Sequence, residues 1–216
     1  MRNSLITIFS VLFLDQLVKL WIKTSYSLNE EVGDWFIFKT QFVENDGMAF
    51  GWTLGAMFGI DGGWAKVILS CFRIIALILI AFYIKRLIQT KAHPLFIICI
   101  SLVFAGALGN ALDGAFYGIL FSESTFTNVS TFLPESGGYA PFLMGKVVDM
   151  FEFTIQCPQW LPWYDSQSNP EHLLFPFIFN VADMAISCSV IFIIIFYKKI
   201  VRDEDFQFLK KKKSEA

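Results

Sequence analysis

The sequence has little of what metal centres and disulfide frameworks are built from. Its 216 residues include two histidines, His93 and His172, which lie far apart, and four cysteines. Three of the cysteines, Cys71, Cys99 and Cys188, fall inside apolar segments, where cysteine behaves as a small hydrophobic residue. No pair has the spacing of zinc ligands. We therefore expect neither a bound metal nor a disulfide-stabilised secreted fold.

Charge is also scarce. Charged residues make up 17% of the chain, and the net charge of −2 gives no reason to expect a nucleic-acid partner. The sequence is instead 55% hydrophobic, with 25 phenylalanines and a mean hydropathy of +0.55. This composition indicates an integral membrane protein. We expect a single domain over residues 1–216, because the length leaves room only for a few spanning helices and their loops.

Four apolar segments are long enough to cross a bilayer core of about 30 Å, which takes roughly 20 residues in a helix. They cover about residues 4–22, 64–84, 94–117 and 176–197. We expect the first to be retained rather than cleaved as a signal peptide. Asp15 and Lys19 interrupt its apolar region, and no cleavage site of small residues follows.

Basic residues predict how these segments are oriented. They gather between the second and third segments and in the C-terminal tail, at Lys85, Arg86, Lys91, Lys198, Lys199, Arg202 and 210–213. Lysine and arginine accumulate on the cytoplasmic side of membrane proteins. We therefore expect both termini in the cytoplasm, with residues 23–63 and 118–175 outside.

The outer segments contain a predicted strand and a long insertion. Asp34 to Val43 is rich in aromatic and β-branched residues, and a turn signal follows at residues 45–47, so we expect part of a small sheet on the membrane surface. Residues 122–138, rich in Ser, Thr and Gly, predict a flexible or separately folded excursion. Three aromatic residues typical of membrane-interface anchors come later, namely Trp160, Trp163 and Tyr164.

Ionisable residues inside apolar segments are costly and need a partner or a function. Asp15 and Lys19 are four residues apart in the first segment, a spacing that favours a structural ion pair on one helix face. Arg73 lies within the second segment. Its side chain can face the bundle as the counter-charge of an acid, or extend to the membrane surface.

The third and fourth segments repeat an Asn-x-x-Asp spacing, with Asn110 and Asp113 in one and Asn180 and Asp183 in the other. Small residues around Asn110 leave open a purely structural packing seam. A further acid, Asp149, follows two valines in the second outer segment, where we expect a loop after the insertion. Two carboxyls at one site cannot both ionise easily, so one keeps a proton, and this is the starting state of an aspartyl protease.

Taken together, these motifs closely resemble the lipoprotein signal peptidases, the type II signal peptidases of bacteria. The matching stretches follow the family's order over nearly the whole chain: Asp15-Gln-Leu-Val-Lys19, Asn45-Asp-Gly-Met-Ala-Phe50, Gly106-Ala-Leu-Gly-Asn-Ala-Leu-Asp113, Val147-Val-Asp149 and Phe179-Asn-Val-Ala-Asp183. We therefore expect a mainly α membrane protein with four transmembrane helices, a small extracytoplasmic β-sheet and a long inserted loop. The resemblance implies the bacterial cytoplasmic membrane, with the active site near its outer face.

The resemblance also implies roles for particular residues. Asp149 and Asp183 match the catalytic dyad of a membrane aspartyl endopeptidase that uses no cofactor. The family substrate is a prolipoprotein whose lipobox cysteine carries diacylglycerol, and cleavage falls just before that cysteine. Membrane lipids and cyclic peptide antibiotics of the globomycin type are further expected ligands. Substrate-binding or supporting positions are Asn45, Gly47, Asn110, Asp113, Asn180, Asp15 and Lys19.

Two features depart from the family pattern. The family usually has an arginine directly after the third-motif aspartate, where this chain has Gly114. We expect Lys146 or Arg73 to supply the missing charge. The second departure is an insertion at about residues 118–145, much longer than the family's usual link.

Two other classes of protein stay open at this stage. Buried acids, amides and bases in four helices are also compatible with a small proton-coupled carrier, or with a scaffold whose polar residues only pack helices. Against a carrier, the acids cluster near one surface and no inverted repeat is evident. Release of a signal peptide from a lipidated precursor would separate the peptidase from both.

Overall fold

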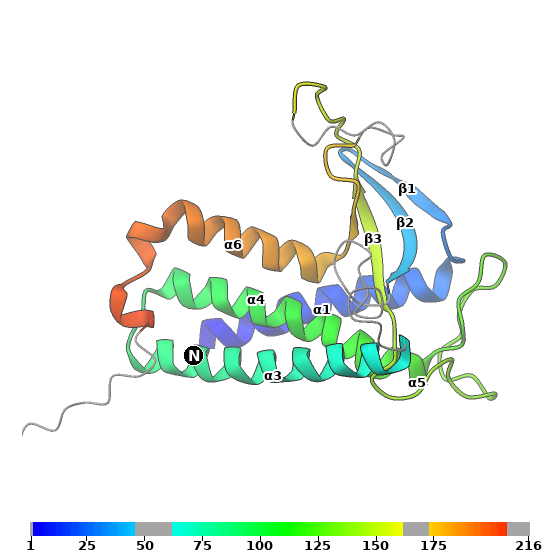
Figure 1. Cartoon of the computed structure of the whole chain (residues 1–216), viewed down its shortest axis with the longest axis horizontal. Helices are drawn as coiled ribbons and strands as arrows, with labels where there is room; N and C mark the ends of the chain where they lie inside the picture. The colour runs from blue at the N-terminus through cyan, green and yellow to red at the C-terminus, as the bar shows by residue number, and fades with distance from the viewer. Residues whose placement is uncertain (1, 46–61, 162–172, 207–216) are drawn as a thin grey trace, which may run out of the picture.

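The computed structural model describes residues 2–45, 62–161 and 173–206. Long helices form its main body: α1 (Arg2–Ser25), α3 (Gly62–Gln89), α4 (Pro94–Leu112) and α6 (Val181–Ile200). They run alongside one another, and a small sheet stands at one end of the bundle (Figure 1). The chain ends its described part in a short 3-10 helix, η3 (Asp203–Phe206), at the opposite end of the bundle from the sheet.

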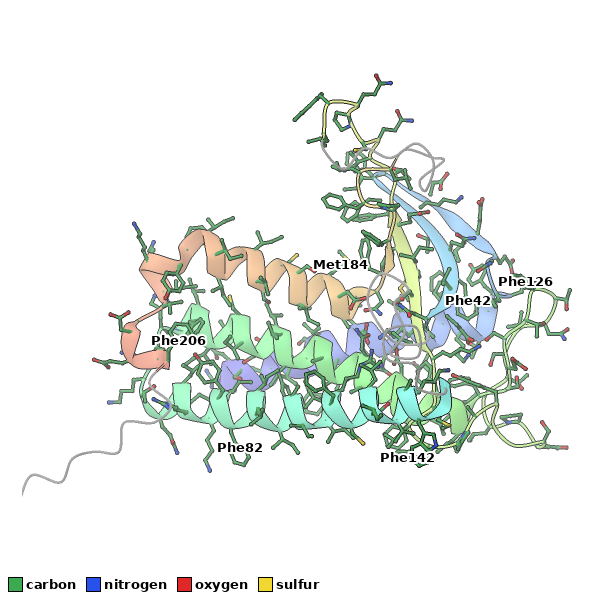
Figure 2. The ribbon with its side chains drawn as sticks, viewed as in Figure 1. Phe42, Phe82, Phe126, Phe142, Met184 and Phe206 are labelled. Atoms are coloured by element: carbon green, nitrogen blue, oxygen red, sulfur yellow. The ribbon has the colours of Figure 1, made fainter. Side chains whose placement is uncertain are left out.

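Four helices of the described chain are long and apolar enough to cross a membrane. Large apolar side chains cover their outer surfaces, including Phe82 on α3, which is 65% exposed and points away from the bundle (Figure 2). Such a surface suits a lipid solvent rather than water. The four predicted spans are therefore confirmed as helices, and α1 and α3 are each longer than predicted.

The fourth helix begins later than predicted, at Val181 instead of residue 176. The preceding residues form the short strand β4 (Ile178–Phe179), and Asn180 caps the helix with its side chain. The apolar run that continues through both elements concealed this boundary, because hydropathy alone does not separate a buried strand from the start of a helix.

Helix α4 occupies the middle of the bundle and packs against α1, α3 and α6. Its contact with α6 depends on Gly106, where a Cβ atom would overlap the backbone carbonyl of Ala182 and the side chain of Ile186. Small residues let helix backbones approach closely. The packing seam predicted for the glycines of this segment is confirmed.

Beyond α4 the helical path continues through a π-helical turn, η2 (Asp113–Tyr117), into α5 (Gly118–Leu120). The π turn widens the helix just where Asp113 and Gly114 follow each other. Turns of this kind are rare and frequent at functional sites.

The sheet has four antiparallel strands in the order β1 (Glu31–Trp35), β2 (Phe38–Asn45), β3 (Val147–Phe153) and β4. The prediction of one strand from Asp34 to Val43 is wrong, because the chain turns at Phe36 and Ile37 to form a hairpin. Phe36 takes a left-handed φ of 54° and is fully exposed. None of the usual turn residues stands at this position to indicate the turn.

The insertion after α5 is attached to the body of the protein, which contradicts the prediction of a flexible or separately folded excursion. Its backbone bonds to α5 through Leu133 N–H, which donates to Leu120 O at 2.7 Å. Its Ser124 hydroxyl accepts a hydrogen bond from buried Lys23 of α1 at 3.0 Å, and Phe121 joins a core with Phe42. Phe42 lies on β2 beside the bundle (Figure 2).

Of the predicted interface anchors, Trp160 is 80% exposed, in keeping with an anchoring role. Trp163 and Tyr164 lie outside the described residues.

Candidate active site

The N-terminus of α6 positions the first acid of the site. Asn180 is the N-cap, and its side-chain oxygen accepts a hydrogen bond from the backbone N–H of Asp183 at 3.0 Å. In return the Asp183 carboxylate accepts the backbone N–H of Asn180 at 3.3 Å. This reciprocal capping box satisfies two free donors of the first turn. It also fixes the direction of the Asp183 side chain.

The second acid, Asp149, lies on β3 and not in a loop as we expected from its place after the insertion. The residue is only 3% exposed. One oxygen accepts a hydrogen bond from Asn180 Nδ2 at 2.6 Å, and the other accepts one from Asn45 Nδ2 at 3.1 Å. Pairing of β3 with β2 and β4 brings these residues together from three distant parts of the chain.

The electrostatics of Asp149 depart strongly from those of a free aspartate. Burial raises the pKa of its carboxyl, and the negative charge of nearby Asp183 adds to the effect. Hydrogen bonds from Asn45 and Asn180 act in the opposite direction, and the resulting pKa is about 7. Asp149 therefore exchanges its proton near neutral pH, which is the property required of an acid–base group.

Asn110 of α4 extends this hydrogen-bonded group. Its Nδ2 donates to Asp183 Oδ1 at 2.8 Å. Its Oδ1 accepts hydrogen bonds from Asn180 at 3.1 Å and from Lys19 Nζ at 2.8 Å. The two Asn-x-x-Asp pairs thus meet side by side, and each asparagine bonds a carboxyl outside its own pair.

Lys19 lies at the centre of a buried ion network below the two acids. Its ammonium group is 2.9 Å from Asp15 and 2.7 Å from Asp113, and none of the three side chains has appreciable exposure. The predicted Asp15–Lys19 pair is confirmed, but it is not self-contained. Lys19 links α1 to α4 as well, and breaking a buried pair of this kind is strongly destabilising.

Asp15 and Asp113 each support one of the elements that carry the site acids. Asp15 Oδ1 accepts the backbone N–H of Ala182 at 2.9 Å and so caps a further donor of α6. Asp113 Oδ2 accepts the backbone N–H of Val148, next to Asp149, at 3.5 Å. The supporting roles that the resemblance implies for Asp15 and Asp113 stay predictions, and these contacts are the ones through which such roles would act.

One polar residue of the network was not singled out by our reading of the sequence. Gln16 Nε2 donates to Asp113 Oδ1 at 2.8 Å and to Asp15 at 3.2 Å, and its Oε1 accepts from the Tyr117 hydroxyl at 3.2 Å. The signal was its place beside Asp15 in an otherwise apolar helix, since a buried amide needs partners.

The two candidates for the missing arginine occupy different surroundings. A Cβ atom on Gly114 would lie 3.4 Å from Arg73 Nη1, so the guanidinium of α3 occupies the space beside this glycine. Lys146 instead pairs with Glu44 at 3.4 Å and lies over the Tyr139 ring. Gly47, a further predicted site residue, lies outside the described residues.

Comparison with known proteins decides the class of this site. A profile of the family described as Signal peptidase (SPase) II matches residues 7–199. The chain belongs to the signal peptidase II family. It is therefore an enzyme, an aspartic-type endopeptidase, and a multi-pass membrane protein. This membership confirms the resemblance and removes the carrier and scaffold alternatives.

Curated signal peptidase II relatives extend over most of the chain. A lipoprotein signal peptidase of Porphyromonas gingivalis is 37% identical over 197 residues, covering 88% of this chain and 80% of the relative. That of Amoebophilus asiaticus is 30% identical over 191 residues, covering 84% and 72%.

Two solved structures share the fold. Both are described as bacterial membrane enzymes determined by the in meso method, at 2.3 and 1.9 Å resolution. They superpose with TM-scores of 0.57 and 0.56 at 21% and 23% sequence identity. The alignments cover 98% and 92% of this chain, and 94% of each structure. The mainly helical fold with a small sheet is confirmed.

Proposed function

We propose that Asp149 and Asp183 are the catalytic dyad with which this signal peptidase removes signal peptides from prolipoproteins. The observation that carries the proposal is the role of Asn180, which bonds both acids: Nδ2 donates to Asp149 at 2.6 Å, and its backbone N–H donates to Asp183 at 3.3 Å. The strand and the helix are thus joined at their two carboxyls.

The dyad acts as one acid and one base. The ionised carboxyl takes a proton from a water molecule, whose oxygen attacks the scissile carbonyl, while the protonated carboxyl donates a hydrogen bond to the carbonyl oxygen. Collapse of the tetrahedral intermediate breaks the C–N bond, and the leaving amine takes a proton from the dyad. The pKa of about 7 for Asp149 supports a shared proton at neutral pH. Coupled acids titrate as a pair, so the proton belongs to both.

A lipid-modified substrate fits the surroundings of the dyad. An apolar groove of about 530 Å³ lies between α1, α4, α6 and the sheet. Its lining includes Phe151 of β3 and Val181 and Met184 from the first turn of α6, the turn that also carries Asp183. The Met184 side chain is visible beside the start of α6 (Figure 2). We propose that an acyl chain of the diacylglyceryl group lies here and that cleavage falls just before the lipidated cysteine. Such tethering removes much of the translational entropy of the peptide.

We also propose on which side of the membrane the enzyme acts and which other ligands it binds. The N-terminus and η3 lie at the end of the bundle opposite the sheet (Figure 1), and Lys85, Arg86 and Lys91 mark the cytoplasmic end by charge. The dyad then works at the outer face of a bacterial cytoplasmic membrane, in contact with membrane lipids. Cyclic peptides of the globomycin type are proposed to compete with the prolipoprotein for this site.

The test uses purified enzyme and a diacylglyceryl-modified prolipoprotein. Asp149→Asn and Asp183→Asn are each expected to lower cleavage by at least about 10³-fold, since a general acid or base contributes up to about 10⁴-fold on its own. Asp34→Asn, an exposed acid on β1, is the matched control and should cleave normally. Substantial cleavage by a folded variant of either acid would remove that residue from the dyad.

A further inference from the structure

We propose that Arg73 is a positioning residue that sets the pH range of the enzyme, because its positive charge, held in the space beside Gly114, keeps the dyad singly protonated. This inference rests on the proposed dyad. It assigns a role to a charged residue of α3.

Arg73 lies against the π turn that carries Gly114. Arg73 Nη1 lies 3.4 Å from the position that a Cβ atom on Gly114 would take, and Ser70 Oγ lies 3.9 Å from it. Residues 70 and 73 are neighbours on one face of α3, so that face contacts the π turn of η2. Ser70 also donates a hydrogen bond to Leu143 O at 2.9 Å, which ties the end of the insertion to the same face.

Arg73 is surrounded by negative charge. Its guanidinium interacts electrostatically with Asp113, Asp183 and Asp149. Asp113 is already held by Lys19 at 2.7 Å. A cation at membrane depth needs compensating negative charge. Asp113 divides its charge between Lys19 and Arg73, and Asp149 and Asp183 add further negative charge around Arg73.

Two groups of described ionisable side chains lie around the dyad. Lys23 on α1, Glu44 on β2 and Lys146 before β3 form one, which carries +1 in the presence or absence of Arg73. The other interacts directly with the dyad or with Arg73, and consists of Asp15 and Lys19 on α1, Arg73 on α3, Asp113 on η2, Asp149 on β3 and Asp183 on α6. It has four carboxyls and two cations, so with one proton on the dyad this group carries −1. Without Arg73 it would carry −2 and would bind a second proton more readily. The dyad would then become doubly protonated, with no base left to activate water.

The lack of a side chain at Gly114 leaves room for the guanidinium group of Arg73. A methyl group there would only touch the flexible end of Arg73, at 3.4 Å. A branched side chain would occupy the place of the guanidinium and push its charge away from the acids. The two substitutions at this position therefore separate the effect of filling the space from the effect of moving the charge.

The experiment measures kcat/KM for a lipidated prolipoprotein from pH 5 to pH 9. Arg73→Gln is expected to move the acidic limb of the profile to higher pH by about half a unit to one unit, the size of a screened interaction between two charges. Arg73→Lys should leave the acidic limb where it is in the parent enzyme, because lysine keeps the positive charge. Gly114→Leu should shift the limb as Arg73→Gln does, and Gly114→Ala should leave it in place.

Arg86→Gln is the matched control. It removes an arginine from the same helix 13 residues farther on, about 20 Å along the axis, and should not move the limb. An acidic limb that stays in place in both Arg73→Gln and Gly114→Leu overturns the inference, whatever the height of the profile. If Arg73→Gln does not fold, Gly114→Leu decides alone.

Failure here is distinct from failure of the dyad. Asp149→Asn that abolishes cleavage, together with an unmoved limb in the Arg73 and Gly114 variants, refutes only the role of Arg73. Asp149→Asn that cleaves normally refutes the dyad itself.

Discussion

At the scale of single residues, three asparagine side chains position the two carboxyls of the site. Asn45, Asn110 and Asn180 donate to carboxyl oxygens at 2.6–3.1 Å, and none of them changes charge with pH. Hydrogen bonds to a carboxylate favour its ionised form. They therefore hold the two acids in place, and at Asp149 the bonds from Asn45 and Asn180 limit how far burial raises the pKa.

The titration of Asp149 predicts how stability depends on pH. The pKa of this group is about 7 in the folded protein and 3.8 ordinarily, so between these values the folded state binds more protons than the unfolded state. The free energy of unfolding then falls as pH rises through this window. The fall due to this group is at most about 4 kcal/mol. Melting of Asp149→Asn in detergent should show a correspondingly flatter dependence, and an equal slope in both proteins would contradict the assigned pKa.

The buried lysine of α1 predicts a large loss of stability on neutralisation. Lys19→Met leaves Asp15 and Asp113 without their cation and should destabilise the protein by roughly 3–5 kcal/mol. The measurement is the thermal midpoint in detergent. Lys39→Met removes a partly exposed lysine of β2 that pairs with Glu31, and should cost roughly 1 kcal/mol or less. Equal effects of the two substitutions would show that the buried network contributes nothing special.

At this scale the sequence predicted which residues lie close together, and their roles in catalysis stay a prediction. Asp149, Asp183, Asn45, Asn110 and Asn180 all lie where their motifs implied a shared site. The sequence left open whether Arg73 or Lys146 lies beside Gly114, because that choice depends on how α3 packs against η2. Motifs record which residues occur, and they carry no information on the rotation of one helix against another.

At the scale of elements, the site depends on a strand that local sequence could not place. Asp149 lies on β3, whose partner β2 precedes it by roughly a hundred residues, with Val43 opposite Asp149. Strand pairing at that separation is invisible to periodicity, which reports only neighbouring residues. The helices were predicted well for the opposite reason, since apolar runs of about 20 residues are local.

The contact of α1 with α4 gives a prediction about packing. A Cβ atom at Gly109 would lie 2.6 Å from Asp15 Oδ2 and 3.3 Å from its Cγ. Gly109→Ala must therefore displace Asp15 from Lys19 and from the start of α6, and should cost roughly 2–3 kcal/mol, as overpacking does.

Gly63→Ala is its matched control. The added methyl would meet only the terminal methyl of Met144, at 3.3 Å, and this flexible side chain can move. The thermal midpoint in detergent should fall clearly for Gly109→Ala and stay within a few degrees for Gly63→Ala. A Gly109→Ala protein as stable as the parent would contradict the close approach of the two helices.

At the scale of the whole molecule, the bundle and the sheet each supply one of the two acids. Helices α1, α4 and α6 supply the ion network and Asp183, whereas the sheet supplies Asp149 and Asn45. Phe142 of the insertion lies at the sheet end of α3 (Figure 2), where its ring contacts Phe116 of η2 at 5.5 Å between centroids. The insertion thus packs against the end of the bundle that carries the proposed dyad.

The proposed orientation predicts which positions a membrane-impermeant thiol reagent can reach in intact cells. In a background without native cysteines, Glu135→Cys in the insertion should be labelled directly. Gln89→Cys at the end of α3 should be labelled only after the membrane is opened. Both residues are exposed in the structure. The reverse pattern would place the dyad in the cytoplasm.

The division of the dyad between β3 and α6 has a consequence for the newly made enzyme. Asp149 acquires its place only when β3 pairs with β2 and β4, and Asp183 acquires its place only when the last helix of the bundle starts at Asn180. A nascent chain that has not yet delivered residue 183 has only one acid of the proposed dyad. Under the proposed mechanism, the peptidase therefore becomes active only when its final span is in the membrane.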